Sequence, residues 1–230
     1  MKALLLAAGF GSRLGDLTSE TPKPLIQVRN QAILGFCLDQ LADSEITEVV
    51  VNTHYLASQV ENFLGDYKSD LKIIPSYEEK LLGTAGTVKK HFEFLATGDF
   101  VVMHADNYFV DPLSNFLHAH KSRRVGMYGT LGTFETGDPK NCGVLVLNED
   151  KTILEFHEKV ENPPSKIANA AIYAFTPKIK DALFSLNQEN PDISKHLIPE
   201  IMHGLCTHNF NGLFVDIGTP KGLAIANNHN

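Results

Sequence analysis

Two cationic side chains stand close to a glycine-rich segment near the start of the sequence. An apolar run over residues 3–8 leads into Gly9-Phe-Gly-Ser-Arg13, and Lys23 follows between two prolines. Glycine lets backbone N–H groups approach a phosphate closely. A guanidinium adds a bidentate phosphate contact and an ammonium adds a point charge. This combination predicts a binding site for a nucleoside triphosphate.

Two better-known glycine loops are excluded by the residues that follow. A dinucleotide fingerprint needs a third glycine and an acidic residue about 20 positions later. Here Leu14 takes the third glycine position, and residues 28–31 read Val-Arg-Asn-Gln. The Walker sequence G-x-x-x-x-G-K-[ST] does not occur in the chain. A strand followed by a glycine turn without a ligand is the alternative, and Arg13 and Lys23 argue against it.

Two aspartates follow predicted strands and are candidates for a metal site. Asp106 comes after the apolar run Phe100–His104, and Asp216 ends the run from Leu213 and precedes a predicted helix. Mg²⁺ prefers hard oxygen ligands and takes one or two carboxylates together with substrate phosphates. Either aspartate alone could instead be a helix cap or a turn residue. Together, beside a phosphate loop, they predict a shared Mg²⁺ site.

Two further segments have a chemical and a structural interpretation. Lys159 ends a predicted hairpin and could hold the phosphate of a second substrate, although a lysine there is often a solvated surface group. Leu82-Gly-Thr-Ala-Gly86 could leave room for a nucleotide base, or could simply begin a helix. Spacing alone does not separate these alternatives.

Strand and helix patterns alternate along the first half of the chain. Apolar runs predict strands at residues 2–8, 48–52, 71–75, 100–104 and 125–130. Helical spacing predicts helices at residues 31–43, 57–64, 87–95 and 112–121. This order predicts an α/β protein with a mainly parallel, Rossmann-like mixed sheet flanked by helices. Ligands bind such sheets beyond the carboxyl ends of the strands.

The second half of the chain lacks the regular alternation of strands and helices seen in the first half. Residues 143–147 and 153–157 predict a β-hairpin, and residues 169–175 a further strand. Helices are expected at 177–186 and 193–203, then a strand at 213–217 and a helix at 220–227 capped by Thr219. We expect a single domain over residues 1–230. Residues 1–135 would mainly form the nucleotide-binding lobe, and residues 136–230, which contain the hairpin, the lobe for a second, acceptor substrate.

Composition and charge limit the possible partners. The chain has 230 residues, 43% hydrophobic and 20% charged, with a net charge of −7. This charge argues against nucleic acid or an anionic membrane as a partner. The three cysteines lack C-x-x-C spacing and fit a reducing compartment, with Cys37 packed on the apolar side of a helix. We expect a cytoplasmic protein without signal peptide or membrane span. The sequence pattern does not indicate an oligomeric state.

Seven ordered motifs resemble those of the sugar-1-phosphate nucleotidyltransferases, also called nucleotide-sugar pyrophosphorylases. These motifs cover nearly the whole chain and begin at Ala7, Thr21, Leu82, Ala105, Phe156, Asn169 and Asp216. Within the family, the chain most resembles short bacterial guanylyltransferases for mannose 1-phosphate or heptose 1-phosphate. Short uridylyltransferases for N-acetylmuramic acid 1-phosphate are similar too. The resemblance implies the nucleotide-diphospho-sugar transferase fold, without a C-terminal β-helix.

The resemblance also implies roles for individual residues. Arg13, Lys23 and Asp106 would be catalytic, and Asp106 and Asp216 would hold Mg²⁺. The remaining nucleotide-binding residues would be Ala8, Gly9, Gly11, Ser12, Gly83 and Gly86. The sugar phosphate would bind to Gly143, Glu158, Lys159 and Asn169. Three positions depart from the family pattern, at Ala105, Val160 and Ala171, and the last two put the identity of the sugar in doubt.

The reaction implied is transfer of a nucleoside monophosphate from an NTP to a sugar 1-phosphate, with release of pyrophosphate. GTP with mannose 1-phosphate or heptose 1-phosphate is the expected pair, which would place the enzyme in nucleotide-sugar biosynthesis for cell-surface polysaccharide. The alternatives are a uridylyltransferase for an N-acetylated sugar 1-phosphate and a cytidylyltransferase for a non-sugar phosphate. A silent nucleotide-sugar sensor is a further alternative, but it predicts the loss of charged groups that are all present.

Overall fold

The computed structural model describes residues 1–229, which form two compact units. The first unit contains residues 1–81, residues 103–114 and the chain from Gly212 on. The second unit contains residues 82–102 and 115–211. Each unit is therefore built from separate stretches of sequence, and each is described below by itself. The assignment of nucleotide binding to residues 1–135 and sugar-phosphate binding to residues 136–230 stays a prediction.

A parallel sheet forms the centre of the first unit. Its strands, in the order β1, β4 and β5, are Lys2–Leu6, Glu48–Thr53 and Lys72–Tyr77. The register pairs Leu4 with Val50 and Val50 with Ile74. The valine run of β4 is buried, as is typical of a parallel strand covered on both faces. The apolar runs therefore predicted these three strands.

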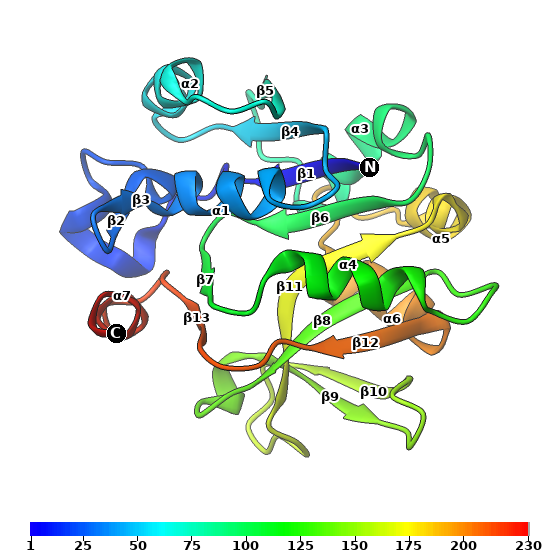
Figure 1. The fold of residues 1–230 in the computed structure, drawn as a ribbon. Helices are drawn as coiled ribbons and strands as arrows, with labels where there is room; N and C mark the ends of the chain where they lie inside the picture. The colour runs from blue at the N-terminus through cyan, green and yellow to red at the C-terminus, as the bar shows by residue number, and fades with distance from the viewer. Residues whose placement is uncertain (230) are drawn as a thin grey trace. The chain divides into compact units, whose positions relative to one another are not determined.

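Helices of the first unit follow the periodicity of the sequence. They are α1 (Ile33–Ala42), α2 (Ala57–Asp66) and α7 (Pro220–Asn228), and Figure 1 shows α2 beside β4 and β5. Buried residues of α1 recur at Ile33, Cys37 and Leu41, which is the fourfold spacing seen in the sequence. Helix α7 begins as predicted, because the Thr219 side chain accepts a hydrogen bond from the Gly222 N–H.

Short elements complete the first unit, and the sequence pattern predicted one of them, β13 (Phe214–Asp216), as the strand at residues 213–217. Strands β7 (Asn107–Phe109) and β13 form an antiparallel ribbon, and β2 (Gln27–Val28) pairs with β3 (Gln31–Ala32). Two 3₁₀ helices, η1 (Ser12–Thr18) and η2 (Lys23–Leu25), follow β1. Strands β2, β3 and β7 and helix η2 have only two or three residues and no measurable hydrophobic period, so periodicity could not predict them. The seven-residue η1 was also not predicted.

The second unit is built on mixed pairing. Its strands are β8 (Gly129–Glu135), β9 (Gly143–Leu147), β10 (Ile153–Glu158), β11 (Ile167–Phe175) and β12 (Leu205–Asn209). Strand β11 pairs antiparallel with β8 and β9, β9 forms the predicted hairpin with β10, and β12 is parallel to β8. Strand β6 (Phe100–His104) begins in this unit and ends in the first.

Helices of the second unit include α3 (Thr84–Leu95) and α4 (Leu113–Lys121), whose first two residues belong to the first unit. The expected helix at residues 177–186 is present as η4 (Pro177–Ile179) and α5 (Lys180–Ser185). A short 3₁₀ turn, η3 (Pro139–Asn141), precedes β9.

Two sequence predictions in the second unit are wrong. The strand expected at residues 125–130 begins only at Gly129, because Val125 is fully exposed and Gly126 has a φ of 98° in a turn. The single helix expected at residues 193–203 is three short turns: η5 (Ile193–Leu197, a π-helix), α6 (Ile198–Ile201) and η6 (Met202–Gly204). Pro199 has no N–H to continue the preceding turn and lies in the first turn of α6.

Two expectations drawn from composition can be compared with the described residues. Cys37 is fully buried in α1, as predicted, and all three cysteines are free thiols. Among residues 1–229, none of the helices has both the length and the apolar character needed to cross a membrane.

Candidate functional site

The structure explains the glycine at position 11 of the first loop but not the glycine at position 9. Gly11 has a φ of 71°, and a Cβ there would meet the Lys23 Cβ and the Thr18 Cγ2 at 2.9 Å. The fold itself therefore requires Gly11. Gly9 is exposed, lacks a left-handed φ, and a Cβ there would meet no atom within 4 Å. Nothing in the described residues requires a glycine at position 9, so a ligand is the better reason for it.

We predict that Gly9→Ala separates ligand binding from stability. The free energy of unfolding should be unchanged or up to about 1 kcal/mol higher, because alanine restricts the unfolded chain. The KM for the nucleoside triphosphate should rise at least about tenfold, since the Cβ would keep phosphate oxygens from the backbone. Urea unfolding and steady-state kinetics measure the two effects. Gly98→Ala, also in open space, should change neither, and an unchanged KM at Gly9→Ala would contradict this role.

A cluster of two cations and two carboxylates lies in the first unit, and we call Arg13, Lys23, Asp106 and Asp216 the charge cluster. The Lys23 ammonium contacts the Asp106 carboxylate and lies 3.4 Å from the Asp216 Oδ1. The Arg13 guanidinium donates to the Asp216 Oδ2 at 3.0 Å. Lys23 is buried, whereas the Arg13 side chain is 58% exposed and can turn toward a ligand. The structure thus brings together all four charged residues that the sequence singled out in this unit.

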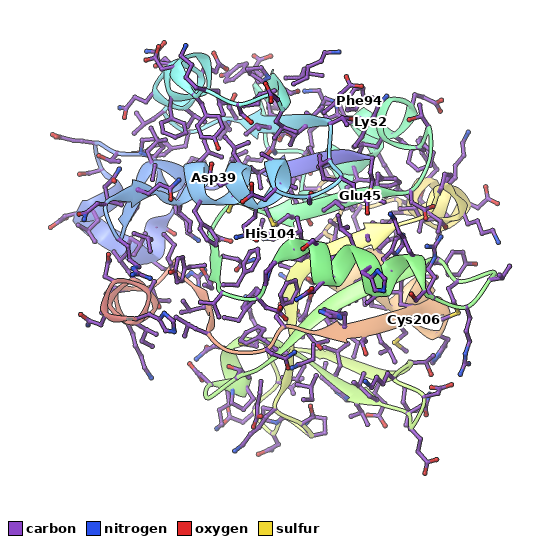
Figure 2. All side chains as sticks on the ribbon, viewed as in Figure 1. Lys2, Asp39, Glu45, Phe94, His104 and Cys206 are labelled. Atoms are coloured by element: carbon purple, nitrogen blue, oxygen red, sulfur yellow. The ribbon has the colours of Figure 1, made fainter. Side chains whose placement is uncertain are left out.

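The short ribbon of β7 and β13 places the two carboxylates side by side. Asn107 is opposite Asp216 in its register, and the Ile217 N–H donates to the carbonyl oxygen of Asp106. His104, labelled in Figure 2, ends β6 two residues before Asp106. Both aspartates therefore lie where strands end, which is where ligands of open α/β sheets bind.

Gly218 is a residue of this cluster whose role sequence reasoning missed. Its N–H donates to the Asp216 Oδ1 at 2.6 Å. A Cβ on Gly218 would clash with the Lys23 Nζ and would lie 2.7 Å from the Asp216 Oδ1 and 2.8 Å from the Arg13 Nη2. The charge cluster therefore occupies the space that a side chain would need. The sequence signal was its position in the motif that begins at Asp216, where no role had been assigned to it.

Pairing keeps Lys23 and Asp106 charged. Burial would lower the pKa of Lys23, but the charges of Asp106 and Asp216 outweigh it and raise this pKa above its usual value. Burial would raise the pKa of Asp106, but Lys23, His104 and Arg13 together hold it below the usual carboxyl range. The two directions agree with an ion pair that persists at neutral pH.

The donor set of the charge cluster fits a Mg²⁺ ion that is held partly by substrate. Asp106 and Asp216 supply hard carboxylate oxygens that share one neighbour, the Lys23 ammonium. Within residues 1–229 there is no group of three or more acidic, histidine or cysteine side chains that could hold a metal. Two carboxylates alone leave most of the coordination to phosphates and water, which is the usual Mg²⁺ arrangement.

Asn52, at the end of β4, connects the phosphate loop to the sheet and was also missed. Its Oδ1 accepts the Ala7 N–H at 2.8 Å, two residues before Gly9. Its Nδ2 donates to the Glu78 Oε1 at 3.0 Å, and both side chains are buried. The far end of the loop is held as well, because the Tyr55 hydroxyl donates to the carbonyl oxygens of Thr18 and Ser19. Asn52 in β4 and Tyr55 just after it therefore fix the chain on both sides of the glycine loop.

We predict that Asn52→Ala lowers the free energy of unfolding by about 1–3 kcal/mol, because the buried Ala7 N–H and Glu78 carboxyl lose this partner. It should also raise the KM for the nucleoside triphosphate, because the start of the loop is released. Urea unfolding and steady-state kinetics measure the two effects. Asn148→Ala, which removes an exposed hydrogen bond to Thr152, should change stability by less than about 0.5 kcal/mol. Equal stability of the two variants would refute this role of Asn52.

The second glycine segment begins α3 of the second unit. Gly83 has a φ of 76°, and a Cβ there would lie 2.5 Å from the carbonyl oxygen of Pro191. That same carbonyl accepts the N–H groups of Ala85 at 2.9 Å and Gly86 at 3.2 Å. The interpretation as a helix start is therefore correct, and these two N–H groups are already bonded. A base-binding role for Gly83 and Gly86 stays a prediction.

Three residues predicted to bind the sugar phosphate lie together in the second unit. Gly143 is opposite Glu158 in the hairpin, and a Cβ on Gly143 would lie 2.5 Å from the Glu158 Oε2. The Lys159 Nζ is 3.7 Å from the Glu158 Oε1. Burial raises the pKa of Glu158, and Asp192 raises it further, against the lowering effect of Lys159 and Lys195. This arrangement presents one exposed cation beside one half-buried carboxyl.

The fourth predicted residue, Asn169, lies at an irregularity of β11. Its Oδ1 accepts the N–H of Ala171, which has a φ of 51°, and its Nδ2 donates to the Tyr173 hydroxyl at 2.8 Å and the Ser194 Oγ at 3.1 Å. Alanine is found in this left-handed region less readily than glycine. The Asn-Ala-Ala segment nevertheless forms the turn, because the Asn169 side chain holds it.

Comparison with known proteins identifies the family. The family model described as "Nucleotidyl transferase" matches residues 2–230. The chain belongs to the nucleotidyl transferase family. The match includes every residue of the charge cluster and every predicted residue of the second unit.

Several curated relatives are similar over nearly the whole chain. The "Mannose-1-phosphate guanylyltransferase catalytic subunit beta" of Dictyostelium discoideum is 33% identical over 96% of this chain and 62% of its own length. The "Probable mannose-1-phosphate guanylyltransferase 1" of Oryza sativa subsp. japonica gives the same three figures. The "Bifunctional protein GlmU" of Methanococcus aeolicus is 32% identical over 100% of this chain and 54% of its own length. The chain thus spans a little over half the length of these relatives.

Solved structures confirm the expected fold class. A candidate glucose-1-phosphate thymidylyltransferase of Bacillus anthracis covers 100% of this chain and 96% of its own, with a TM-score of 0.89 and 23% identity. HddC of Yersinia pseudotuberculosis, solved with GMP-PN, has a TM-score of 0.80, 21% identity and coverage of 98% and 97%. The α/β nucleotidyltransferase fold, with a mainly parallel mixed sheet flanked by helices, was therefore predicted correctly.

Proposed function

We propose that the chain transfers a nucleoside monophosphate from a nucleoside triphosphate to a sugar 1-phosphate. The observation that carries this proposal is the charge cluster beside a glycine loop, in a chain of this family. Two cations with unequal exposure suit two phosphate groups in different positions. Two carboxylates that pair with these cations can release them when phosphates arrive.

In the proposed reaction an oxygen of the acceptor phosphate attacks the α-phosphorus of the nucleotide in line. The new bond joins that oxygen to the α-phosphorus, and the bond from the α-phosphorus to the pyrophosphate oxygen breaks. The attacking oxygen is already anionic at neutral pH, so no side chain has to remove a proton. Catalysis then consists of positioning and charge neutralisation.

Each charged residue has a defined task in this scheme. Arg13, the exposed cation, leaves Asp216 and neutralises the departing pyrophosphate. Lys23, buried and protonated, lies where the α-phosphate and the acceptor phosphate meet. Asp106 and Asp216 would hold Mg²⁺, which would supply further neutralisation of the negative charge. Lys159 would hold the phosphate of the acceptor, with Glu158 and Asn169 binding its sugar.

GTP with mannose 1-phosphate is the proposed pair, with heptose 1-phosphate as a second acceptor. The names of the relatives from Dictyostelium and rice support guanylyl transfer to mannose 1-phosphate. The departures at Val160 and Ala171 both fall beside proposed acceptor residues.

A pyrophosphate-release assay with four NTPs tests this function. Each NTP is combined with mannose, heptose, glucose, N-acetylglucosamine and N-acetylmuramic acid 1-phosphates, and with phosphocholine, in the presence of Mg²⁺. Release with GTP and mannose or heptose 1-phosphate is the expected result. Turnover only with UTP would indicate a uridylyltransferase instead. Turnover only with CTP and phosphocholine would indicate a cytidylyltransferase for a non-sugar phosphate. No release with any pair would exclude the enzyme.

A further inference from the structure

The clearest polar group that the proposed function leaves unused is the Ser194 hydroxyl. Ser194 lies on the one-turn π-helix η5 of the second unit and is half-buried. Its Oγ is 3.1 Å from the Asn169 Nδ2 and 3.3 Å from the Tyr173 hydroxyl. Single-turn π-helices occur frequently at functional sites. Ser194 thus belongs to the same polar group as Asn169, which is a proposed acceptor-binding residue.

The hydrogen atoms of this group can be assigned. The Asn169 Oδ1 accepts the Ala171 N–H, which fixes the orientation of the amide because a backbone N–H can only donate. The two hydrogens of the Asn169 amide then go to the Tyr173 and Ser194 oxygens. Asn169 therefore has no remaining hydrogen to offer a sugar.

The Tyr173 proton must also be bonded within the protein. Tyr173 is completely buried, and the acceptor that the structure describes for its proton is the Ser194 Oγ. Burial raises the pKa of Tyr173, so the hydroxyl keeps this proton. The Ser194 oxygen then accepts two hydrogen bonds, from Asn169 and from Tyr173. With the buried Tyr173 as the donor of this contact, no other hydrogen bond is described for the Ser194 proton within residues 1–229.

The backbone of η5 is held firmly against α3. The Asp192 side chain accepts the Lys195 N–H at 2.9 Å and the Thr84 hydroxyl at 3.0 Å. The Thr84 oxygen in turn accepts the Ile193 N–H at 2.7 Å. The Ser194 hydroxyl is therefore positioned before any ligand arrives, which reduces the entropy lost on binding.

We propose that Ser194 binds the acceptor by donating a hydrogen bond to a hydroxyl oxygen of its sugar ring, and that Asn169 and Tyr173 are positioning residues that orient the Ser194 proton. This inference rests on the proposed function. It changes the role given to Asn169, whose amide hydrogens are consumed inside the protein. The Ser194 hydroxyl offers one neutral hydrogen-bond donor, which suits a hydroxyl oxygen of the sugar. The phosphate of the acceptor is anionic and is instead matched by the cation Lys159.

The test compares wild type, Ser194→Ala, Ser194→Thr and a matched control, Ser185→Ala. Ser185 also carries one hydroxyl in the second unit, bonded to the Ala182 carbonyl oxygen on exposed α5. The probe is mannose 1-phosphate with GTP, or the pair that wild type uses fastest. Ser194→Ala should raise the KM for the sugar 1-phosphate about tenfold, with the KM for the nucleotide unchanged. Ser194→Thr, which keeps the hydroxyl, should recover most of the acceptor affinity lost in Ser194→Ala, and Ser185→Ala should stay near wild type.

Deoxy analogues of the acceptor identify the hydroxyl. Wild type should lose about tenfold in kcat/KM with one deoxy analogue, and Ser194→Ala should lose nothing further with that same analogue. If the loss in kcat/KM from Ser194→Ala and the loss from the missing hydroxyl multiply for every analogue, Ser194 does not contact a sugar hydroxyl. If wild type turns over and Ser194→Ala has an unchanged KM for the sugar 1-phosphate, the proposed role of Ser194 is wrong, while the proposed function stands. No turnover by wild type with any pair would instead remove the proposed function and this inference with it.

Discussion

Replacing Lys23 by methionine should lower kcat for pyrophosphate release at least about a hundredfold, because a preorganised charge at the reacting phosphates is lost. The free energy of unfolding at neutral pH should fall by about 3 kcal/mol, because the variant leaves Asp106 beside a methyl group where an ammonium stood. Urea unfolding and steady-state kinetics measure the two effects. Lys72→Met, which breaks an exposed pair with Glu48, should cost less than about 1 kcal/mol.

The pH dependence of this loss has a defined sign. In the wild type the pKa of Asp106 is lowered, so its contribution to stability is present above the usual carboxyl range and is lost as the pH falls through the folded-state pKa. The pKa of Lys23 is raised, so its contribution persists at neutral pH and is lost only above the usual lysine range. In Lys23→Met, burial acts on Asp106 without its main opposing charge, so its pKa should rise. The stability deficit of the variant should therefore shrink between pH 7 and pH 5.

A double variant separates the structural effect from the catalytic one. Lys23→Met with Asp106→Asn removes both charges, so most of the lost stability should return. Activity should not return, because both proposed catalytic groups are absent. Near-normal turnover in Lys23→Met would refute the assignment of Lys23 to the reacting phosphates, whatever the stability of the variant.

The parts of the fold that the sequence predicted are those with a local physical signal. The valine run of β4, the fourfold spacing of α1 and the Thr219 cap each appear in one short window of sequence. The carboxyl-end rule then placed Asp106 and Asp216 near each other, although it could not show that Lys23 lies between them. That geometry depends on the pairing of β13 with β7, and β7 has three residues and no periodicity to detect, so only β13 was predicted.

Residues whose role depends on distant partners could not be found in this way. Asn52 and Ala7 are 45 positions apart, and Ser194 and Asn169 are 25 apart. Their types, an asparagine and a serine, are common in turns and helix caps. Only the three-dimensional pairing shows that one fixes the phosphate loop and that the other carries an unused proton.

Gly218→Ala should abolish most of the activity while leaving the fold intact, in contrast to Lys23→Met. The new Cβ would clash with the Lys23 Nζ, the Asp216 Oδ1 and the Arg13 Nη2, all of which are ends of side chains. Such atoms can move without displacing the backbone, so the free energy of unfolding should change by less than about 1 kcal/mol. Displacement of both cations should lower kcat/KM about a hundredfold or more, since positioning of charge is the proposed source of catalysis.

A second glycine four residues away provides the matched control. In Gly222→Ala the Cβ would clash with the backbone carbonyl oxygen of Asp216, which cannot move by rotation of a side chain. This variant should lose several kcal/mol of stability, as overpacked backbone contacts do, and its activity should fall in proportion to the folded protein that remains. Equal stability losses in the two variants would show that Gly218 is needed only for the turn before α7. Full activity in a folded Gly218→Ala would show that the charge cluster, as arranged here, does not act on the phosphates.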